Sequence, residues 1–200
     1  MHRLLVAEKI SAALRLATVL SEGKAKRLRA DGVSQFTFSR AGDEWRAIPL
    51  RGHFLNLDYP PELNDWDSVD LDALIDAEPV PTITDPETVQ ALRSASESVD
   101  EVVGATDYDR EGELIGLEAV RVVHEVSASA GVRRARFSAL TRPELVAAFE
   151  NLGDLDERLA TSAIDGILVY ADDAEACREV VRAAALHRLA CIVEVELTHR

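Results

Sequence analysis

The stretch DEVVGATDYDREGELIGLEAV, residues 100–120, decides the fold of this chain. Its first part (100–106) is a short apolar run and predicts a buried strand. Apolar residues at helical spacing predict a long helix from Glu111 to Val126. Between the two lie residues 107–110, two of which are acidic, so a buried strand leads through charged residues directly into a helix.

Further strands and helices alternate on both sides of this unit. Residues 35–40 and 44–50 predict a hairpin that turns at residues 41–43. The other expected strands are 3–7 and 133–137, and the expected helices are 11–20, 86–98, 141–150 and 154–163. This alternation predicts an α/β fold, with a mostly parallel sheet covered by helices on both faces.

Composition along the chain suggests two parts. Residues 1–160 are expected to form one domain, interrupted by an acidic, proline-rich excursion at residues 58–86 with little regular structure. Residues 161–200 differ in character and predict a short βαβ-like appendage. Its elements are expected at 167–171 (strand), 173–189 (helix) and 191–197 (strand).

Length and composition exclude several classes of protein. The 200 residues suffice for an α/β domain with its own core, and 47% hydrophobic with 29% charged residues excludes wholesale disorder. Nothing approaches the roughly 20 apolar residues that a membrane span requires, and Glu8 and Lys9 interrupt the apolar start. We therefore expect a cytoplasmic protein without a membrane partner. Two cysteines form neither a disulfide framework nor a zinc site.

Charge is distributed unevenly. The net charge of −14 disfavours nucleic acid as a partner when taken alone, but residues 1–57 carry +5 and residues 58–100 carry −11. A basic first third could hold a phosphate backbone locally. The remaining acidity is equally compatible with adaptation to a high-salt cytoplasm.

The acidic segment after the second strand suggests metal chemistry. In an extended chain Asp107, Asp109 and Glu111 would point to the same side. Three such carboxylates repel one another unless a cation lies between them, and Mg²⁺ is a hard cation that prefers oxygen ligands. The alternative is that acids at a helix N-terminus only complement the helix dipole. Glu8, which follows the first strand, favours the catalytic interpretation, because strand ends of a parallel sheet share one edge.

Four ordered blocks of sequence resemble the N-terminal Toprim domain of type IA DNA topoisomerases, closest to the topoisomerase III-like and archaeal branch. The blocks are VAEKISAALRLATVL (6–20), LRGHFLNLDYP (50–60), ATDYDREGELIGLEAV (105–120) and RFSALTRPELVAAFENLGDLDERLA (136–160). The resemblance covers about residues 1–160. It implies a Rossmann-like Toprim sheet, Mg²⁺ as cofactor and a single-stranded region of DNA as partner.

The resemblance also implies roles for individual residues. Glu8 matches the family's general acid/base beside the scissile phosphate, and Lys9 matches the lysine that positions that phosphate. The family's magnesium-binding carboxylates match Asp107, Asp109 and Glu111. Supporting or DNA-binding positions match Arg110, Glu113 and His53, and Arg51 is a further candidate for a backbone contact, as are Lys24, Lys26, Arg27 and Arg29. The alternative for His53 is a structural role, and the alternative for Arg110 is an ion pair with an acidic neighbour. The other cations would then be solvated surface charges.

The family's nucleophilic tyrosine has no counterpart in this sequence. Tyr59, Tyr108 and Tyr170 all lack the family's context for that residue. We therefore expect a fragment, a split gene product or a degenerate copy, whose strand cleavage and religation would need a tyrosine-bearing gate domain or subunit. Two alternatives stay open: a stand-alone Toprim nuclease or primase-like enzyme, and a non-catalytic DNA-binding module.

Overall fold

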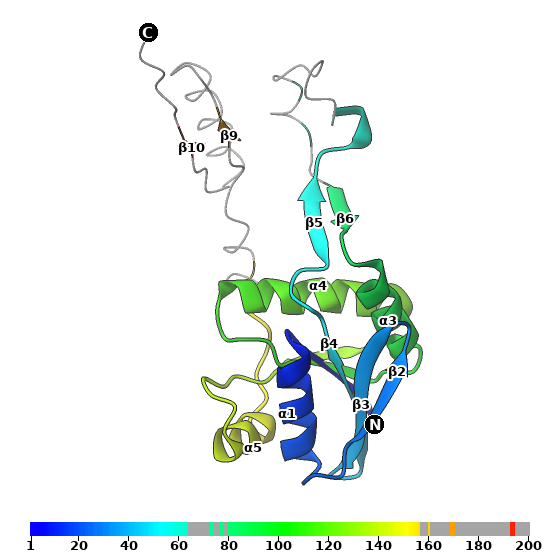
Figure 1. Cartoon of the computed structure of the whole chain (residues 1–200), viewed down its shortest axis with the longest axis vertical. Coiled ribbons are helices and arrows are strands. Elements are labelled where there is room, and N and C mark those ends of the chain that lie inside the picture. The colour runs from blue at the N-terminus through cyan, green and yellow to red at the C-terminus, as the bar shows by residue number, and fades with distance from the viewer. Residues whose placement is uncertain are drawn as a thin grey trace. The chain divides into compact units, whose positions relative to one another are not determined.

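A computed structural model describes residues 1–63, 73, 77, 80–156, 160, 169–170 and 193–194. Contacts divide the chain into two units, residues 1–56 with 82–161 and residues 57–81 with 162–200. The first unit is an α/β sandwich around a six-stranded sheet (Figure 1). The expected domain boundary near residue 160 stays a prediction.

The sheet of the first unit is mostly parallel, as the sequence predicts. Its order is β2-β3-β4-β1-β7-β8; β4, β1, β7 and β8 run parallel, and β2 and β3 add an antiparallel edge. The strands are β1 (His2–Ala7), β2 (Lys26–Ala30), β3 (Val33–Arg40), β4 (Asp43–Pro49), β7 (Glu101–Gly104) and β8 (Gly131–Arg134). The helices are α1 (Ile10–Leu20), α3 (Pro86–Ser96), α4 (Arg110–Val126) and α5 (Arg142–Glu150).

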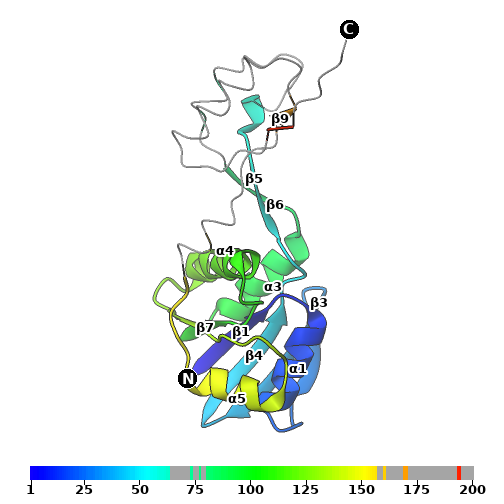
Figure 2. The same cartoon turned by 90° about the vertical axis from the view of Figure 1, so that its left-hand side faces the viewer.

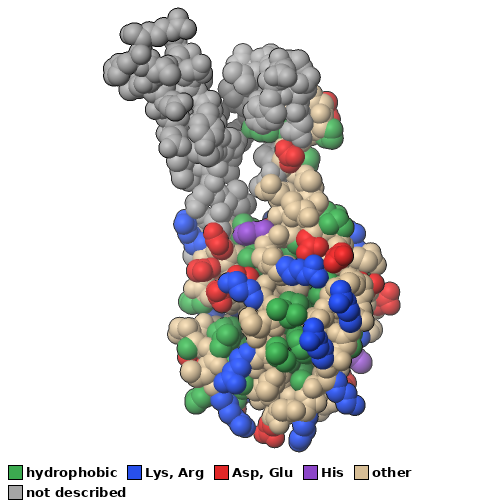
Figure 3. Space-filling view, viewed as in Figure 1, with side chains coloured by type: hydrophobic (Ala, Val, Ile, Leu, Met, Phe, Trp, Pro, Cys, Tyr) green, Lys and Arg blue, Asp and Glu red, His purple; other side chains and the backbone are tan. Residues whose placement is uncertain are grey.

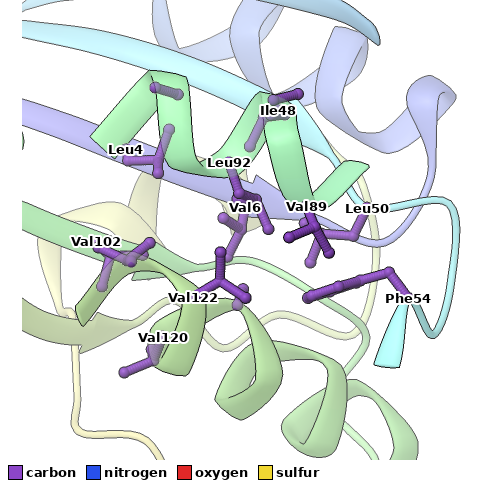
Figure 4. Packing of buried hydrophobic residues seen from close by; sticks show 14 of the residues in the cluster. Leu4, Val6, Ile48, Leu50, Phe54, Val89, Leu92, Val102, Val120 and Val122 are labelled. Atoms are coloured by element: carbon purple, nitrogen blue, oxygen red, sulfur yellow. The ribbon is translucent and has the colours of Figure 1, made fainter. Parts of the chain in front are cut away.

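Alternate residues of β1 supply the two halves of the core. Leu4 and Val6 pack with α3 and α4 on one face, where Figure 4 shows them among Ile48 and Leu92. Leu5 and Ala7 pack with α1 and α5 on the other face. Figure 2 shows these two helix layers on opposite sides of the sheet. Because all four β1 side chains are fully buried, β1 is the central strand around which both layers form.

Several expected elements form where they are predicted. The hairpin β3–β4 turns at residues 41–43, with Ala41 and Gly42 both at positive φ. Asp85 caps α3 by accepting a hydrogen bond from the Thr88 amide at 3.1 Å, and Pro86 occupies the first turn. The corresponding expectations for this hairpin and helix are confirmed.

One strand forms that the sequence did not predict, and one expected strand is shifted. The sequence gives no periodic signal for β2, in which Leu28 is the only large apolar residue of KRLRA; the strand forms because it pairs with β3 along its whole length. The expected strand at 133–137 lies at Gly131–Arg134 instead. Its ladder with β7 stops where Arg134 meets Gly104, so the following residues leave the sheet.

The proline-rich segment contains more structure than its composition predicts. β5 (Leu55–Asp58) and β6 (Val80–Ile83) pair as a two-stranded sheet, and a 3-10 turn, η1, spans Pro61–Leu63. Pro81 is accommodated within β6, because a two-stranded sheet consists only of edges.

In the C-terminal segment, β9 (Val169–Tyr170) pairs in parallel with β10 (Val193–Glu194). Most of the helices expected at 154–163 and 173–189 lies outside the described residues. No helix in the described part of the chain is long and apolar enough to cross a membrane.

Candidate functional site

Glu8 and Lys9 lie where the central strand ends. β1 finishes at Ala7, and α1 begins at Ile10 with Lys9 as its extended N-cap residue. The Lys9 Nζ atom contacts Glu8 Oε1 at 2.7 Å. The Glu8 side chain is 17% exposed and that of Lys9 is 65% exposed. A partly buried carboxylate is thus paired with a cation that faces solvent.

The acidic loop between β7 and α4 lies at the same rim. β7 is the parallel neighbour of β1, and the Ala105 amide donates to the Val6 carbonyl at 2.8 Å just beyond the ladder. The pKa of Lys9 is raised, chiefly by its hydrogen bond to Glu8 and that residue's charge, with smaller contributions from Asp107 and Asp109. Carboxylates from both strand ends therefore contribute to the raised pKa of the Lys9 ammonium.

The carboxylates of the acidic loop do not lie along one extended segment. Asp109 is extended and caps α4, with its Oδ1 accepting from the Gly112 amide at 2.7 Å. α4 begins at Arg110, so Glu111 already belongs to the first helical turn. The assumption that the three carboxylates share one extended segment is therefore wrong for Glu111, whereas the helix predicted from Glu111 forms and begins one residue earlier.

The donor atoms of the acidic loop match the preferences of Mg²⁺ only in part. Asp107, Asp109 and Glu111 are exposed and offer the hard oxygen atoms that Mg²⁺ prefers. Mg²⁺ usually keeps several waters and needs only one or two protein carboxylates when phosphate supplies the rest. Among the residues with described positions, no group of three or more His, Cys, Asp or Glu side chains is placed to hold a metal ion. The residues fit the chemistry of Mg²⁺ without forming a complete protein cage.

Gly112 fixes the shape of the acidic loop. A Cβ atom at this position would lie 2.0 Å from the backbone oxygen of Asp107, so no other residue fits without moving the loop. The Thr106 hydroxyl donates to the Gly112 carbonyl at 2.6 Å, which joins the strand end to the first turn of α4. These contacts hold Asp107 close to the helix N-terminus.

A fully buried ion pair lies beneath the same loop. Arg134 Nε donates to Glu113 Oε1 at 2.6 Å, and neither side chain is exposed. The guanidinium also donates to the carbonyls of Gly104, Ala135 and Asp107. Glu113, a candidate from the sequence, is thus inaccessible to DNA here and acts through the loop. Arg134 was not a candidate; its one sequence signal is an arginine inside an expected strand.

His53 and Arg51 join the segment after β4 to helices α4 and α3. His53 Nδ1 lies 3.2 Å from Glu118 Oε1 on α4, and burial raises the pKa of Glu118 while His53 opposes that shift. Arg51 adopts a positive φ and bonds Glu87 and the Gly32 carbonyl. Arg110 is exposed at the start of α4.

Comparisons with known proteins agree with this architecture. The family model for the Toprim domain matches residues 3–140. The chain belongs to the Toprim family. The resemblance to type IA DNA topoisomerases is confirmed by DNA topoisomerase 1 of Thermoplasma acidophilum, 42% identical over 161 residues, and that of Archaeoglobus fulgidus, 37% identical over 164. DNA topoisomerase 3 of Caenorhabditis elegans is 34% identical over 173 residues.

These matches cover 80–82% of this chain but only 21–24% of each relative. The chain therefore spans about a fifth to a quarter of the length of the curated relatives it matches. Among solved structures, full-length topoisomerase I from Thermotoga maritima aligns with a TM-score of 0.51 at 19% identity, covering 80% of this chain and 22% of that one. This structural likeness supports the mixed α/β fold of the Toprim family.

Proposed function

We propose that this Toprim chain supports DNA strand cleavage and religation of the type IA topoisomerase kind. The observation that carries the proposal is the position of Lys9, which pairs with Glu8 and interacts with Asp107 and Asp109 across two neighbouring strand ends. Carboxylates and an exposed cation at the carboxyl edge of a parallel sheet suit a phosphodiester substrate.

Each residue has a chemical role in this proposal. The Lys9 ammonium would stabilise the charge that builds on the non-bridging phosphate oxygens during transesterification. Glu8, once protonated, would donate that proton to the leaving 3′ oxygen and recover it from the 3′ hydroxyl during religation. Asp107, Asp109 and Glu111 would hold Mg²⁺, which supplies positive charge to the DNA backbone. Arg134 and Glu113 would act from below by holding the loop in place.

The nucleophilic tyrosine would come from a gate domain or a separate subunit. Tyr108 lies in the acidic loop, where the guanidinium of Arg136 stands 5.4 Å from its ring centre. The sequence context of Tyr108 differs from that of the family's nucleophilic tyrosine. A single-stranded region of DNA and a cytoplasmic location remain part of the proposal.

Binding of DNA by the full chain tests the proposal. We expect a fluorescein-labelled octathymidylate to bind in the presence of Mg²⁺, as measured by fluorescence anisotropy. Lys9→Gln should weaken binding and reduce the slope of log affinity against log salt by about 0.7, the value for one phosphate contact on a single strand. Arg93→Gln on α3, which removes the same charge from a surface ion pair, should leave both unchanged.

Metal binding is tested separately. The double variant Asp107→Asn with Asp109→Asn should abolish Mg²⁺ binding measured by calorimetry, while asparagine retains the ability to cap α4. Equal Mg²⁺ binding by this variant and the wild type would contradict the proposed ligand set. Metal-dependent nicking of DNA by the chain alone would instead support the stand-alone nuclease.

A further inference from the structure

A cavity of about 450 Å³ opens beside Glu8 and Lys9, away from the acidic loop. It lies between the end of β1, the turn from β2 to β3, and the chain that leaves β4. Its lining includes Glu8, Lys9, Arg29, Val33, Pro49 and Arg51. None of the acidic-loop residues lines it, so this space is distinct from the proposed metal position.

The lining combines cations with an apolar surface. Ile10 is 49% exposed and contributes apolar surface, while Lys9, Arg29 and Arg51 contribute positive charge. Figure 3 shows lysine and arginine side chains around an apolar patch on the face that carries α1 and the β2–β3 hairpin. A ligand that suits this lining has a negatively charged group attached to an apolar or flat body.

The wall of the cavity is held in place before any ligand binds. Arg51 Nη2 donates to the Gly32 carbonyl at 3.3 Å, and Arg51 Nη1 contacts Glu87 Oε2 at 3.2 Å. A Cβ atom at Gly32 would lie 3.0 Å from that same Glu87 oxygen. The β2–β3 turn is therefore closely packed against the N-terminal turn of α3, and a preformed wall reduces the cost of ordering a ligand.

Arg29 supplies a cation that is available to a ligand. It is exposed on β2 and forms no ion pair with another described residue, whereas Arg51 and Lys9 already have carboxylate partners. Arg29 lies directly across the ladder from Ser34, which also lines the cavity. A phosphate in the cavity would therefore meet Arg29 as its principal positive partner.

We propose that this cavity holds one nucleotide of single-stranded DNA, adjacent to the phosphate bound at Glu8 and Lys9. The phosphate of that nucleotide contacts Arg29, and its sugar or base lies against the exposed side chain of Ile10. The volume lies within the range of about 300–1,000 Å³ that is usual for small-ligand pockets. This inference rests on the proposed function and adds a second subsite, which directs the strand across the β2–β3 hairpin.

Two substitutions with matched controls test the subsite by anisotropy with the labelled octathymidylate. Arg29→Gln should weaken binding about tenfold, because it removes a hydrogen-bonded charge pair. Ser34→Leu should weaken binding by filling the cavity without changing the charge. Arg40→Gln removes the same charge at the far end of β3, and Ser39→Leu makes the same replacement on β3 outside the cavity; neither should alter binding.

The outcomes separate this inference from the proposed function. If Lys9→Gln weakens binding but Arg29→Gln and Ser34→Leu do not, the subsite is wrong and the proposed function stands. If the wild type does not bind the oligonucleotide, both are wrong. Thymidine monophosphate should displace the label only at far higher concentration than unlabelled octathymidylate, since it cannot also reach Lys9. Equal competition by the two would overturn the assignment to a DNA strand.

Discussion

Lys9 and Glu118 show two different uses of a single ionisable side chain, one exposed at the rim of the sheet and one buried on α4. Lys9 is exposed, and its hydrogen bond to Glu8 and the nearby carboxylates raise its pKa, which favours its charged form. Glu118 is almost buried on α4, and burial raises its pKa instead. The first is the phosphate contact in the proposed function, whereas the second bonds His53 and secures the segment before β5.

The raised pKa of Glu118 predicts a pH-dependent contribution to stability. The folded state binds this proton more tightly than the unfolded chain, whose glutamate titrates near 4.5. The resulting stabilisation is fully present below that value and is lost as pH rises through the raised pKa. The free energy of unfolding of the wild type, relative to Glu118→Gln, should therefore increase as pH falls from 7 towards 4.5.

Urea unfolding at half-unit pH steps measures this difference. Glu125→Gln, on the same helix but at the exposed surface, serves as the control and should show a much smaller dependence. Parallel curves for the wild type and Glu118→Gln would contradict the assignment of this pH dependence to the Glu118 carboxyl.

At the scale of elements, the ends of neighbouring strands organise the site. β1 and β7 run parallel and end together, so α1 and α4 begin at the same rim and bring Lys9 near Asp109. Arg134 joins β7, β8 and α4 from within by bonding three carbonyls and Glu113. The acidic loop therefore depends on a buried contact as well as on its own sequence.

Loss of Arg134 should disrupt that junction. Arg134→Leu leaves the Glu113 carboxylate buried without its partner, and breaking a buried pair in this way costs about 3–5 kcal/mol of unfolding free energy. Arg93→Leu breaks a surface pair with Glu125 and should cost no more than about 1 kcal/mol. Chemical denaturation measures both; equal small losses would show that the buried pair contributes little.

For the whole molecule, charge is the dominant feature. The chain carries a net charge of −14, yet its first 57 residues carry +5 and include every cation that lines the cavity. Separation of charge in this way allows a phosphate backbone to approach one face of an acidic protein.

The overall negative charge predicts that salt stabilises the fold. Raising KCl from 0.05 to 1 M shortens the range of repulsion from more than 10 Å to about 3 Å, so the melting temperature should rise. Differential scanning calorimetry measures the shift, and NaCl at equal ionic strength should act alike. A melting temperature that is unchanged or falls would exclude repulsion among the acidic residues as a determinant of stability.

Local patterns in the sequence determined much of this architecture. Apolar runs and helical spacing predict β1, α1, α3, β7 and α4, because burying an apolar face imposes a period on the residues that form it. The motif between β7 and α4 also indicated the acidic loop, because its charged residues come directly after a buried strand.

Only the tertiary structure decided the rest. β2 carries no apolar period and forms because β3 offers it a partner. The roles of Arg134 and Glu113 depend on their bond to each other, although the two residues are 21 positions apart in the chain. Such contacts are invisible in a local pattern, because the energy that fixes them arises between segments that meet only when the chain has folded.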